Sequence, residues 1–296
     1  ALADVLHSIL MPIGISFWTF QALSYLIDIY REEEADPTLL EFCLYMAFWP
    51  TVFSGPVCRL YKMLPQFRET LKPTLDDIAM GTFRLVVGLF MKLVMARILE
   101  TGLNSGEGVS AGFDQLNNWG GLDVWFLGIG FGFQLYFDFA GYSHIVIGTA
   151  LLFGIRLEEN FDHPFLSTTP SVFWTRWHMS LSFWIRDYVF FPLAAMLRQA
   201  WWRNVTLMIA MVLFGLWHGA TATFIIWGVY HGLLLIGHRL WQQRTRGMTV
   251  SMPPFLVVIT SWSLTFGLVS LGWIFFRAHD LSQAWKMLAA VVTPAS

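Results

Sequence analysis

"MIAMVLFGLWHGATATFIIWGVYHG", residues Met208 to Gly232, has the composition of a membrane-spanning segment but contains two histidines, His218 and His231. Ionisable side chains at membrane depth are rare, because hydrocarbon solvates them poorly, and by default they indicate a functional site. His218 stands between Trp217 and Gly219. This stretch therefore predicts a membrane-embedded helical fold with a polar site inside it.

The composition of the whole chain extends this prediction to all 296 residues. Hydrophobic residues make up 56% and charged residues only 13%, whereas a soluble domain carries about 25% charged residues. We therefore expect one membrane-embedded domain, residues 1–296, crossing the bilayer several times. The formal net charge of -2 provides no basic face for phosphates, which argues against a nucleic-acid partner. Cys43 and Cys58 have no CxxC or Cys/His spacing, so neither zinc nor redox chemistry is predicted, and Cys58 is expected to be a plain buried or interfacial thiol.

Apolar runs predict about eight embedded segments, since about 20 apolar residues cross a bilayer. They are Leu6–Tyr30, Leu39–Val57, Ile78–Leu99, Val124–Phe137 with Ile145–Ile155, Leu181–Met196, Val205–Trp217, Ala220–Gly237 and Phe255–Phe276. The predicted fold class is all-α. Several segments are short or interrupted, and irregular backbone at membrane depth persists only beside protein or a water-filled cavity. Gly128, Gly130 and Gly132 predict close helix contact or local unwinding. Basic residues near Arg59 and Arg239 favour the cytoplasmic side for these two loops.

The densest polar cluster in apolar surroundings is "FWTRWHMSLSFWIRDYVFFPL", Phe173 to Leu193. Four of its residues recur every four positions and would share one stripe of a helix: Trp174, His178, Ser182 and Arg186. Charges at membrane depth persist by pairing or by facing a cavity. For the adjacent Arg186 and Asp187 we expect a structural ion-pairing role before a chemical one.

Asp138 and Tyr142 form a second polar pair, one helical turn apart in "YFDFAGYSH". A carboxylate there would orient a histidine or contribute to a proton path. A structural hydrogen bond to a neighbouring helix is an equally good explanation. Both residues are therefore candidates for supporting a substrate tunnel.

The chain between His178 and His218 predicts a hairpin, with a break between Pro192 and Asn204. At 1.5 Å per residue the outward leg is ~30 Å and the return leg ~22 Å, which brings the two imidazoles to broadly similar depth. A neutral imidazole can act as a general base on a hydroxyl, and Gly219 leaves space beside His218 for a substrate. For either histidine alone, a satisfied core residue is the alternative. The sequence has no HExxH motif and no carboxylates at metal-ligand spacing, so no metal is predicted.

Six motifs in order carry a resemblance to a known family. They are "GISFWTFQALSYLIDIYR", "SGPVCRLYKMLPQF", "YFDFAGYSHIVIGTALLFGIRLEENFDHPF", "FWTRWHMSLSFWIRDYVFFPL", "GLWHGATATFIIWGVYHG" and "GWIFFRA". Together they resemble the membrane-bound O-acyltransferase family, and most closely its bacterial polysaccharide O-acetylating branch. Family members continue with further membrane segments at both ends, so we expect this chain to be a fragment of such a protein.

The resemblance implies a multi-helix bundle around a central funnel or tunnel in the bacterial inner membrane. It implies transfer of an acyl group, acetyl before longer groups, from a cytoplasmic thioester toward a hydroxyl of an extracytoplasmic polysaccharide or partner protein. His218 and His178 map onto the family's catalytic positions, with Trp177 and Trp217 as pocket walls. No bound cofactor is implied, because acetyl-CoA or an acylated carrier would be a substrate. Besides the acyl donor, the partners implied are the lipid bilayer and extracytoplasmic polysaccharide-modifying proteins.

The alternative is a protein without acyl chemistry. In a multi-pass transporter or scaffold, the histidines, Asp138, Arg186 and Asp187 would form a buried relay.

Overall fold

The computed structural model describes residues 14–32, 36–52, 54–69, 72–103, 107–115, 119–247 and 253–292. All regular elements within these ranges are helical, which confirms the all-α prediction. The chain divides into two compact units. Unit 1 comprises residues 1–88 and 142–159, and unit 2 comprises residues 89–141 and 160–296.

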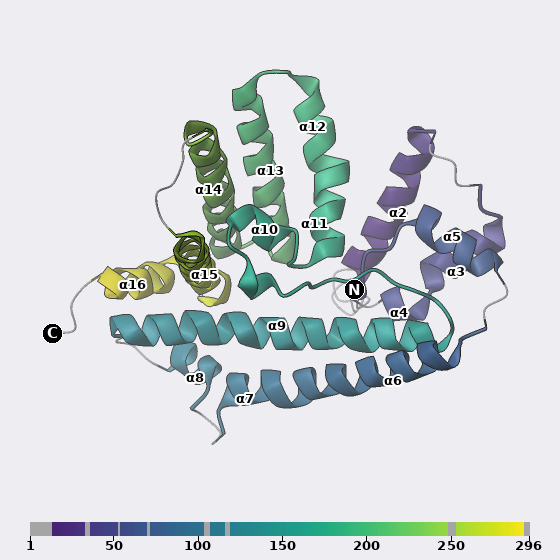
Figure 1. The fold of residues 1–296 in the computed structure, drawn as a ribbon, viewed down its shortest axis with the longest axis horizontal. Helices are drawn as coiled ribbons and strands as arrows, with labels where there is room; N and C mark the ends of the chain where they lie inside the picture. Colours follow the sequence, from purple (N-terminus) through teal and green to yellow (C-terminus); the bar gives the residue numbers. More distant parts are fainter. Residues whose placement is uncertain are drawn as a thin grey trace, which may run out of the picture. The chain divides into compact units, whose positions relative to one another are not determined.

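In its described residues, unit 1 contains α2 to α5 and parts of two longer helices (Figure 1). The complete helices are α2 (Ile15–Tyr30), α3 (Leu39–Ala47), α4 (Trp49–Val52) and α5 (Leu60–Arg68). Most of α6 (Leu75–Phe90) and the last turns of α9 (Gly121–Leu152) complete the unit. Its core consists of Tyr45, Met46, Phe48, Cys58, Leu60, Met63, Leu64, Ala150 and Ile155.

The predicted embedded segment Leu39–Val57 contains two helices, since α3 ends at Ala47 and α4 begins at Trp49. Pro50 explains the break, because proline has no backbone N–H to donate and restricts the residue before it. The carbonyl of Phe48 at the break accepts hydrogen bonds from the N–H and the hydroxyl of Thr51, each at 3.0 Å.

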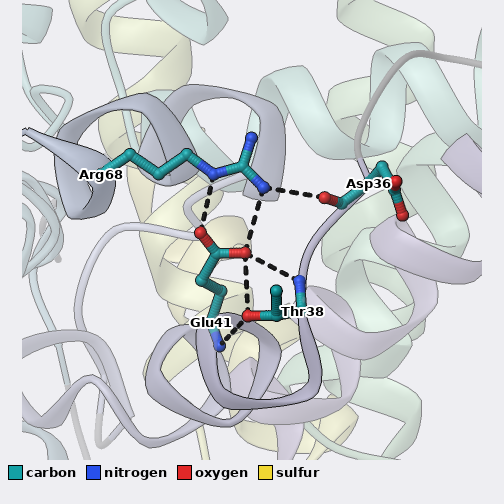
Figure 2. A network of polar contacts seen from close by, with 4 residues as sticks. All are labelled: Asp36, Thr38, Glu41 and Arg68. Carbon is teal, nitrogen blue, oxygen red and sulfur yellow. Dashed lines mark hydrogen bonds and ion pairs between the residues drawn. The ribbon is translucent and has the colours of Figure 1, made fainter.

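A polar network closes the N-terminal end of α3 (Figure 2). The Thr38 hydroxyl accepts from the Glu41 N–H at 3.3 Å, and the Glu41 carboxylate accepts from the Thr38 N–H at 2.7 Å. Arg68 of α5 donates to both Glu41 oxygens and to the Asp36 carbonyl. This capping box satisfies backbone donors that a helix start leaves unpaired, and Arg68 ties α5 to it.

Two glycines bring α6 and α9 together in unit 1. A Cβ added to Gly81 would lie 2.8 Å from the Gly148 carbonyl oxygen, and one added to Gly148 would lie 2.7 Å from that of Gly81. Backbones this close are typical of helix packing in membranes, where small residues line the interface.

Unit 2 carries the long hairpins (Figure 1). Its elements are the π-helical turn η1 (Met91–Met95), α7 (Ala96–Thr101), α8 (Val109–Asp114), most of α9, η2 (Pro164–Leu166), α10 (Pro170–Trp174), α11 (Met179–Ile185), the π-helical turn η3 (Arg186–Phe190), α12 (Phe191–Met196), α13 (Ala200–His218), α14 (Ala222–Arg244), α15 (Pro254–Arg277) and α16 (Leu281–Val292). The predicted hairpin is present: the chain rises through α11, η3 and α12, turns at residues 197–199, and returns along α13.

Glycines set the spacing between α13 and α14, which pack side by side (Figure 1). Added Cβ atoms at Gly215 and Gly228 would lie 2.2 Å from the Phe224 carbonyl oxygen and 2.4 Å from the Met211 carbonyl oxygen. Only a hydrogen atom fits at these two points. The close approach holds the C-terminal end of α13, and therefore His218, against α14.

The two apolar runs predicted together as one embedded segment, Val124–Phe137 with Ile145–Ile155, lie mostly in α9, which is one continuous 32-residue helix. Its glycines provide close contact instead of unwinding. An added Cβ would lie 2.8 Å from the Ser270 carbonyl oxygen at Gly128, and 2.7 Å from the Trp273 ring at Gly132. Packing against α15 therefore outweighs the low helix propensity of glycine.

Four of the described helices are long and apolar enough to cross a membrane: Leu75–Thr101, Gly121–Leu152, Ala200–His218 and Pro254–Arg277. Part of the predicted segment Leu6–Tyr30 lies outside the described residues, whose first helix is α2.

Candidate active site

The loop before α11 holds His178 in an unusual backbone conformation. Its φ of 43° and ψ of 54° place it in the left-handed region, which non-glycine residues rarely adopt. Asn160 anchors the two residues that follow. Its backbone carbonyl accepts from the Met179 N–H at 2.8 Å, and its Oδ1 accepts from the Ser180 hydroxyl at 2.7 Å. The fully buried Asn160 therefore stabilises the left-handed backbone conformation of His178, which would otherwise relax.

The His178 side chain is 1% exposed and lies among aromatic rings. The centroid distances are 4.6 Å to Phe139, 5.8 Å to Trp217 and 6.4 Å to Phe214. Phe139 comes from α9 and the other two from α13, so two helices far apart in the sequence fix this imidazole.

His218 is the last residue of α13, directly before the short turn to α14. It is partly buried. Its ring centroid lies 4.6 Å from Trp217, 4.8 Å from Phe276, 5.4 Å from Trp227, 5.6 Å from Phe214 and 5.9 Å from Phe224. A Cβ added to Gly219 would lie 2.7 Å from the Phe224 ring, so this glycine gives room to Phe224, and the predicted substrate space beside His218 stays a prediction.

The two histidines share two neighbours. Phe214 and Trp217, one helical turn apart on α13, each contact both imidazoles. The hairpin thus brings the two predicted catalytic residues to one place in unit 2.

The predicted helical stripe is wrong at His178. α10 ends at Trp174 and α11 begins at Met179, because the left-handed His178 interrupts the helix. Trp174, Ser182 and Arg186 nevertheless line one cavity of about 200 Å³ between α11, η3, α13 and α14. Phe214 also lines this cavity and so separates it from the histidines.

Ser182 and the pair Arg186–Asp187 serve local structure. The Ser182 hydroxyl donates to the Trp177 carbonyl at 3.0 Å. Arg186 Nε donates to Asp187 Oδ1 at 2.7 Å, and its guanidinium lies 4.6 Å from the Phe183 ring centroid. Arg186 and Asp187 thus pair with each other, and the structural role expected for the two charges stays a prediction.

The two predicted wall residues differ in their surroundings. Trp217 contacts both histidines. Trp177 instead packs with Trp273 at 4.9 Å, with Phe161 at 5.2 Å, and stacked on Phe173 at 5.6 Å. Trp177 therefore supports the loop that carries His178 by packing it against these three aromatic rings.

Asp138 and Tyr142 belong to different units, although they are one turn apart on α9. Asp138 forms an ion pair with Lys92 of η1. The Tyr142 hydroxyl is hydrogen-bonded to the backbone of Ser54. Among the described residues, each thus has a partner on a neighbouring segment, which matches the structural alternative for the pair.

His231 lies in the aromatic cluster next to His218 and shares Trp227 with it. It is fully buried, with ring centroids of Trp227 at 4.9 Å and Trp174 at 5.1 Å. Trp227 lies between the two histidines of the opening stretch, since it also contacts His218. The described residues contain no group of His, Cys, Asp and Glu able to hold a metal ion.

Asn160 and Phe214 are the site residues that sequence reasoning missed. Asn160 stands in "RLEENFDHPF" among charged loop residues, and Phe214 is one of many apolar residues of its segment. Only the position of Phe214 one turn before His218 offered a signal.

Comparison with known proteins places the chain among membrane enzymes. Residues 2–277 match the family described as MBOAT, membrane-bound O-acyltransferase family. The chain is 38% identical to the probable alginate O-acetylase AlgI of Pseudomonas aeruginosa, over 97% of this chain and 52% of that protein. It is 34% identical to a peptidoglycan O-acetyltransferase of Helicobacter pylori, over 98% and 58%. It is also 34% identical to a teichoic acid D-alanyltransferase of Streptococcus thermophilus, over 81% and 60%.

The chain thus spans little more than half the length of the relatives it matches. Within that half it retains the segment carrying both histidines.

Proposed function

Because this chain belongs to the membrane-bound O-acyltransferase family, we propose that it transfers an acyl group, acetyl in the first instance, from a thioester to a hydroxyl. The observation that carries the proposal is the placement of His178 and His218 against the same two rings, Phe214 and Trp217. Two imidazoles in a mostly apolar pocket supply a proton acceptor and a second polar group at one point.

In the proposed reaction, His218 accepts the proton of the acceptor hydroxyl as its oxygen attacks the thioester carbonyl. The new carbon–oxygen bond forms, the carbon–sulfur bond breaks, and the proton passes from His218 to the leaving thiolate. His178, held by the loop that Asn160 anchors, positions the reacting groups and stabilises the developing oxyanion. The surrounding rings exclude water, which limits hydrolysis of the acyl donor.

The donor in this proposal is acetyl-CoA or an acylated carrier on the cytoplasmic side of a bacterial inner membrane. The acceptor is an extracytoplasmic polysaccharide, or a partner protein that completes the transfer. The names of the relatives support this class, since they act on alginate, peptidoglycan and teichoic acid.

The proposal is tested by measuring ester-linked acetate on the polysaccharide of cells that lack their own acyltransferase and express this chain. We expect His218→Ala to abolish acetylation at unchanged membrane levels. His279→Ala is the matched control, because its imidazole is exposed and bonds Asp114 away from the aromatic pocket. Equal acetate with wild-type and His218→Ala protein would favour the transporter or scaffold instead.

A further inference from the structure

The charge pattern of residues 188–279 is one-sided. This stretch of the sequence contains six arginines and no aspartate or glutamate: Arg198, Arg203, Arg239, Arg244, Arg246 and Arg277. Arg277 donates to Asp114 at 2.8 Å. The other five form the group called here the arginine rim.

Most other cationic side chains of the protein differ from the arginine rim, because they form ion pairs. Lys62, Arg68, Arg84, Lys92, Arg97, Arg156, Arg176, Arg186 and Arg277 each contact a carboxylate. Among the described residues, no carboxylate lies within ion-pair distance of any rim arginine. The rim therefore has a net positive charge that the described residues leave uncompensated.

The hairpins gather the arginine rim at one end of unit 2. Arg198 lies in the turn between α12 and α13, and Arg203 in the first turn of α13. α13 and α14 are antiparallel, and Met208 lies beside Gly232. Continuing this register toward the start of α13 places Arg239 level with its first turn, so the C-terminal end of α14 lies beside it (Figure 1). Arg244 ends α14, and Arg246 follows in the next turn.

Two tryptophans and an apolar belt accompany the rim. Trp201 and Trp241 are 58% and 66% exposed, although tryptophan is normally well buried in proteins. Further along the same two helices, Val205, Leu213, Leu216 and Leu233 are exposed as well. On both helices the exposed tryptophan lies among the rim arginines, and the exposed aliphatic residues lie toward the middle of the helix. This arrangement is typical of a helix end at the lipid headgroups, where tryptophan and basic residues gather.

We propose that the arginine rim binds the headgroups of anionic phospholipids. The positive charge requires an anionic partner. Two partners have that charge, an anionic lipid headgroup and a water-soluble acidic protein. The flanking exposed tryptophans and aliphatic side chains favour lipid, because they continue the charged end directly into a surface that suits acyl chains. Arginine pairs with phosphate oxygens through two parallel N–H donors, which fits a phosphodiester headgroup.

The test uses the full chain purified in a nonionic detergent. Its thermal midpoint is followed while phosphatidylglycerol or phosphatidylcholine is added, which gives an apparent Kd for each lipid. We expect phosphatidylglycerol to bind more tightly. The double substitution R203Q/R239Q should weaken it roughly 25-fold, from about five-fold per basic residue near an anionic surface. The effect should shrink at 0.5 M salt, because salt screens exposed charges.

The charge-matched control is K72Q/K286Q, since both lysines are exposed and neither contacts a carboxylate among the described residues. It should leave the apparent Kd unchanged. R203K/R239K should retain most of the binding, which separates loss of charge from loss of fold. Equal response to the two lipids, or equal weakening by the control pair, would overturn the proposal. Rim-dependent binding of poly-L-glutamate with no preference for phosphatidylglycerol would overturn it in favour of an acidic protein.

Discussion

Asn160 holds Ser180 through one oxygen atom: its Oδ1 accepts from the Ser180 hydroxyl at 2.7 Å and from the Ser180 N–H at 3.3 Å. Met179 bonds the Asn160 backbone carbonyl. A residue 18 positions earlier in the chain thus determines the path of the backbone that leaves His178. The position of the His178 imidazole therefore depends on the bonds that Asn160 makes to Met179 and Ser180.

Asn160→Ala should reduce acyl transfer by roughly ten- to a hundred-fold, because small misplacement of a catalytic group is costly. The free energy of unfolding should fall by about 1–3 kcal/mol, since Ser180 loses a buried partner. The measurements are transfer rate per folded protein and thermal unfolding. Ser180→Ala, which removes one bond of the two, should show a smaller effect. Full activity of folded Asn160→Ala protein would contradict the positioning role.

Phe214→Ala should impair transfer more than Phe214→Leu. The Phe214 ring contacts both histidines and lines the cavity beside them. Its removal would leave a void that connects this cavity with the space around the histidines. Truncation of a buried phenylalanine to alanine costs about 3–5 kcal/mol. Thermal unfolding and acetylation assays on both variants check this. Leu213→Ala, one residue away and 44% exposed, should be nearly silent; equal damage there would show that any truncation of α13 suffices.

Gly228→Ala should destabilise the protein by about 1–3 kcal/mol, as overpacking does. The added Cβ would lie 2.4 Å from the Met211 carbonyl oxygen, so α13 and α14 would have to separate. Gly237→Ala is the control on the same helix, because nothing lies within 4 Å of its added Cβ. It should be neutral or stabilising by up to about 1 kcal/mol. Similar thermal midpoints for the two variants would exclude close packing as the cause.

Cys43 should react with maleimide in the folded protein, whereas Cys58 should not. Cys43 is exposed and Cys58 is buried. Burial raises the pKa of the Cys58 thiol to about 12, so at pH 8 only about one molecule in 10⁴ carries the reactive thiolate. We expect one modified thiol per chain in native protein and two after denaturation. Rapid labelling of Cys43→Ser protein would contradict the buried placement of Cys58.

The prediction from sequence succeeded where one property decided the structure. Low charge and long apolar runs predicted helices, and the break after Pro192 predicted the hairpin that brings His178 and His218 together. It failed where distant residues decide the local path. Nothing in "FWTRWHMSL" shows that Asn160 breaks the helix at His178, and nothing in the glycine pattern of α9 shows that α15 keeps it straight.

The tryptophans are a second example in which tertiary packing, and not local sequence, decides the structure. Trp174, Trp177 and Trp184 are all under 9% exposed, although their stretch has the composition of an interfacial loop. Exposed tryptophans occur instead at the arginine rim, in Trp201 and Trp241. The composition of a stretch shows that its tryptophans lie near polar residues. Whether they are buried in the protein or exposed at its surface depends on tertiary packing.

The π-helical turn η3 changes how the segment after it must be compared with relatives. A π turn accommodates one residue more than an α turn, so every later side chain is rotated by about 100° around the helix axis. Deleting one residue within Arg186–Phe190 would therefore turn the outward face of α12 toward α13 while leaving Ser182 in place. A single-residue gap at this point of a sequence alignment therefore means that different residues of the following helix face outward. Such a gap changes the outer surface of the helix more than it changes the length of the chain.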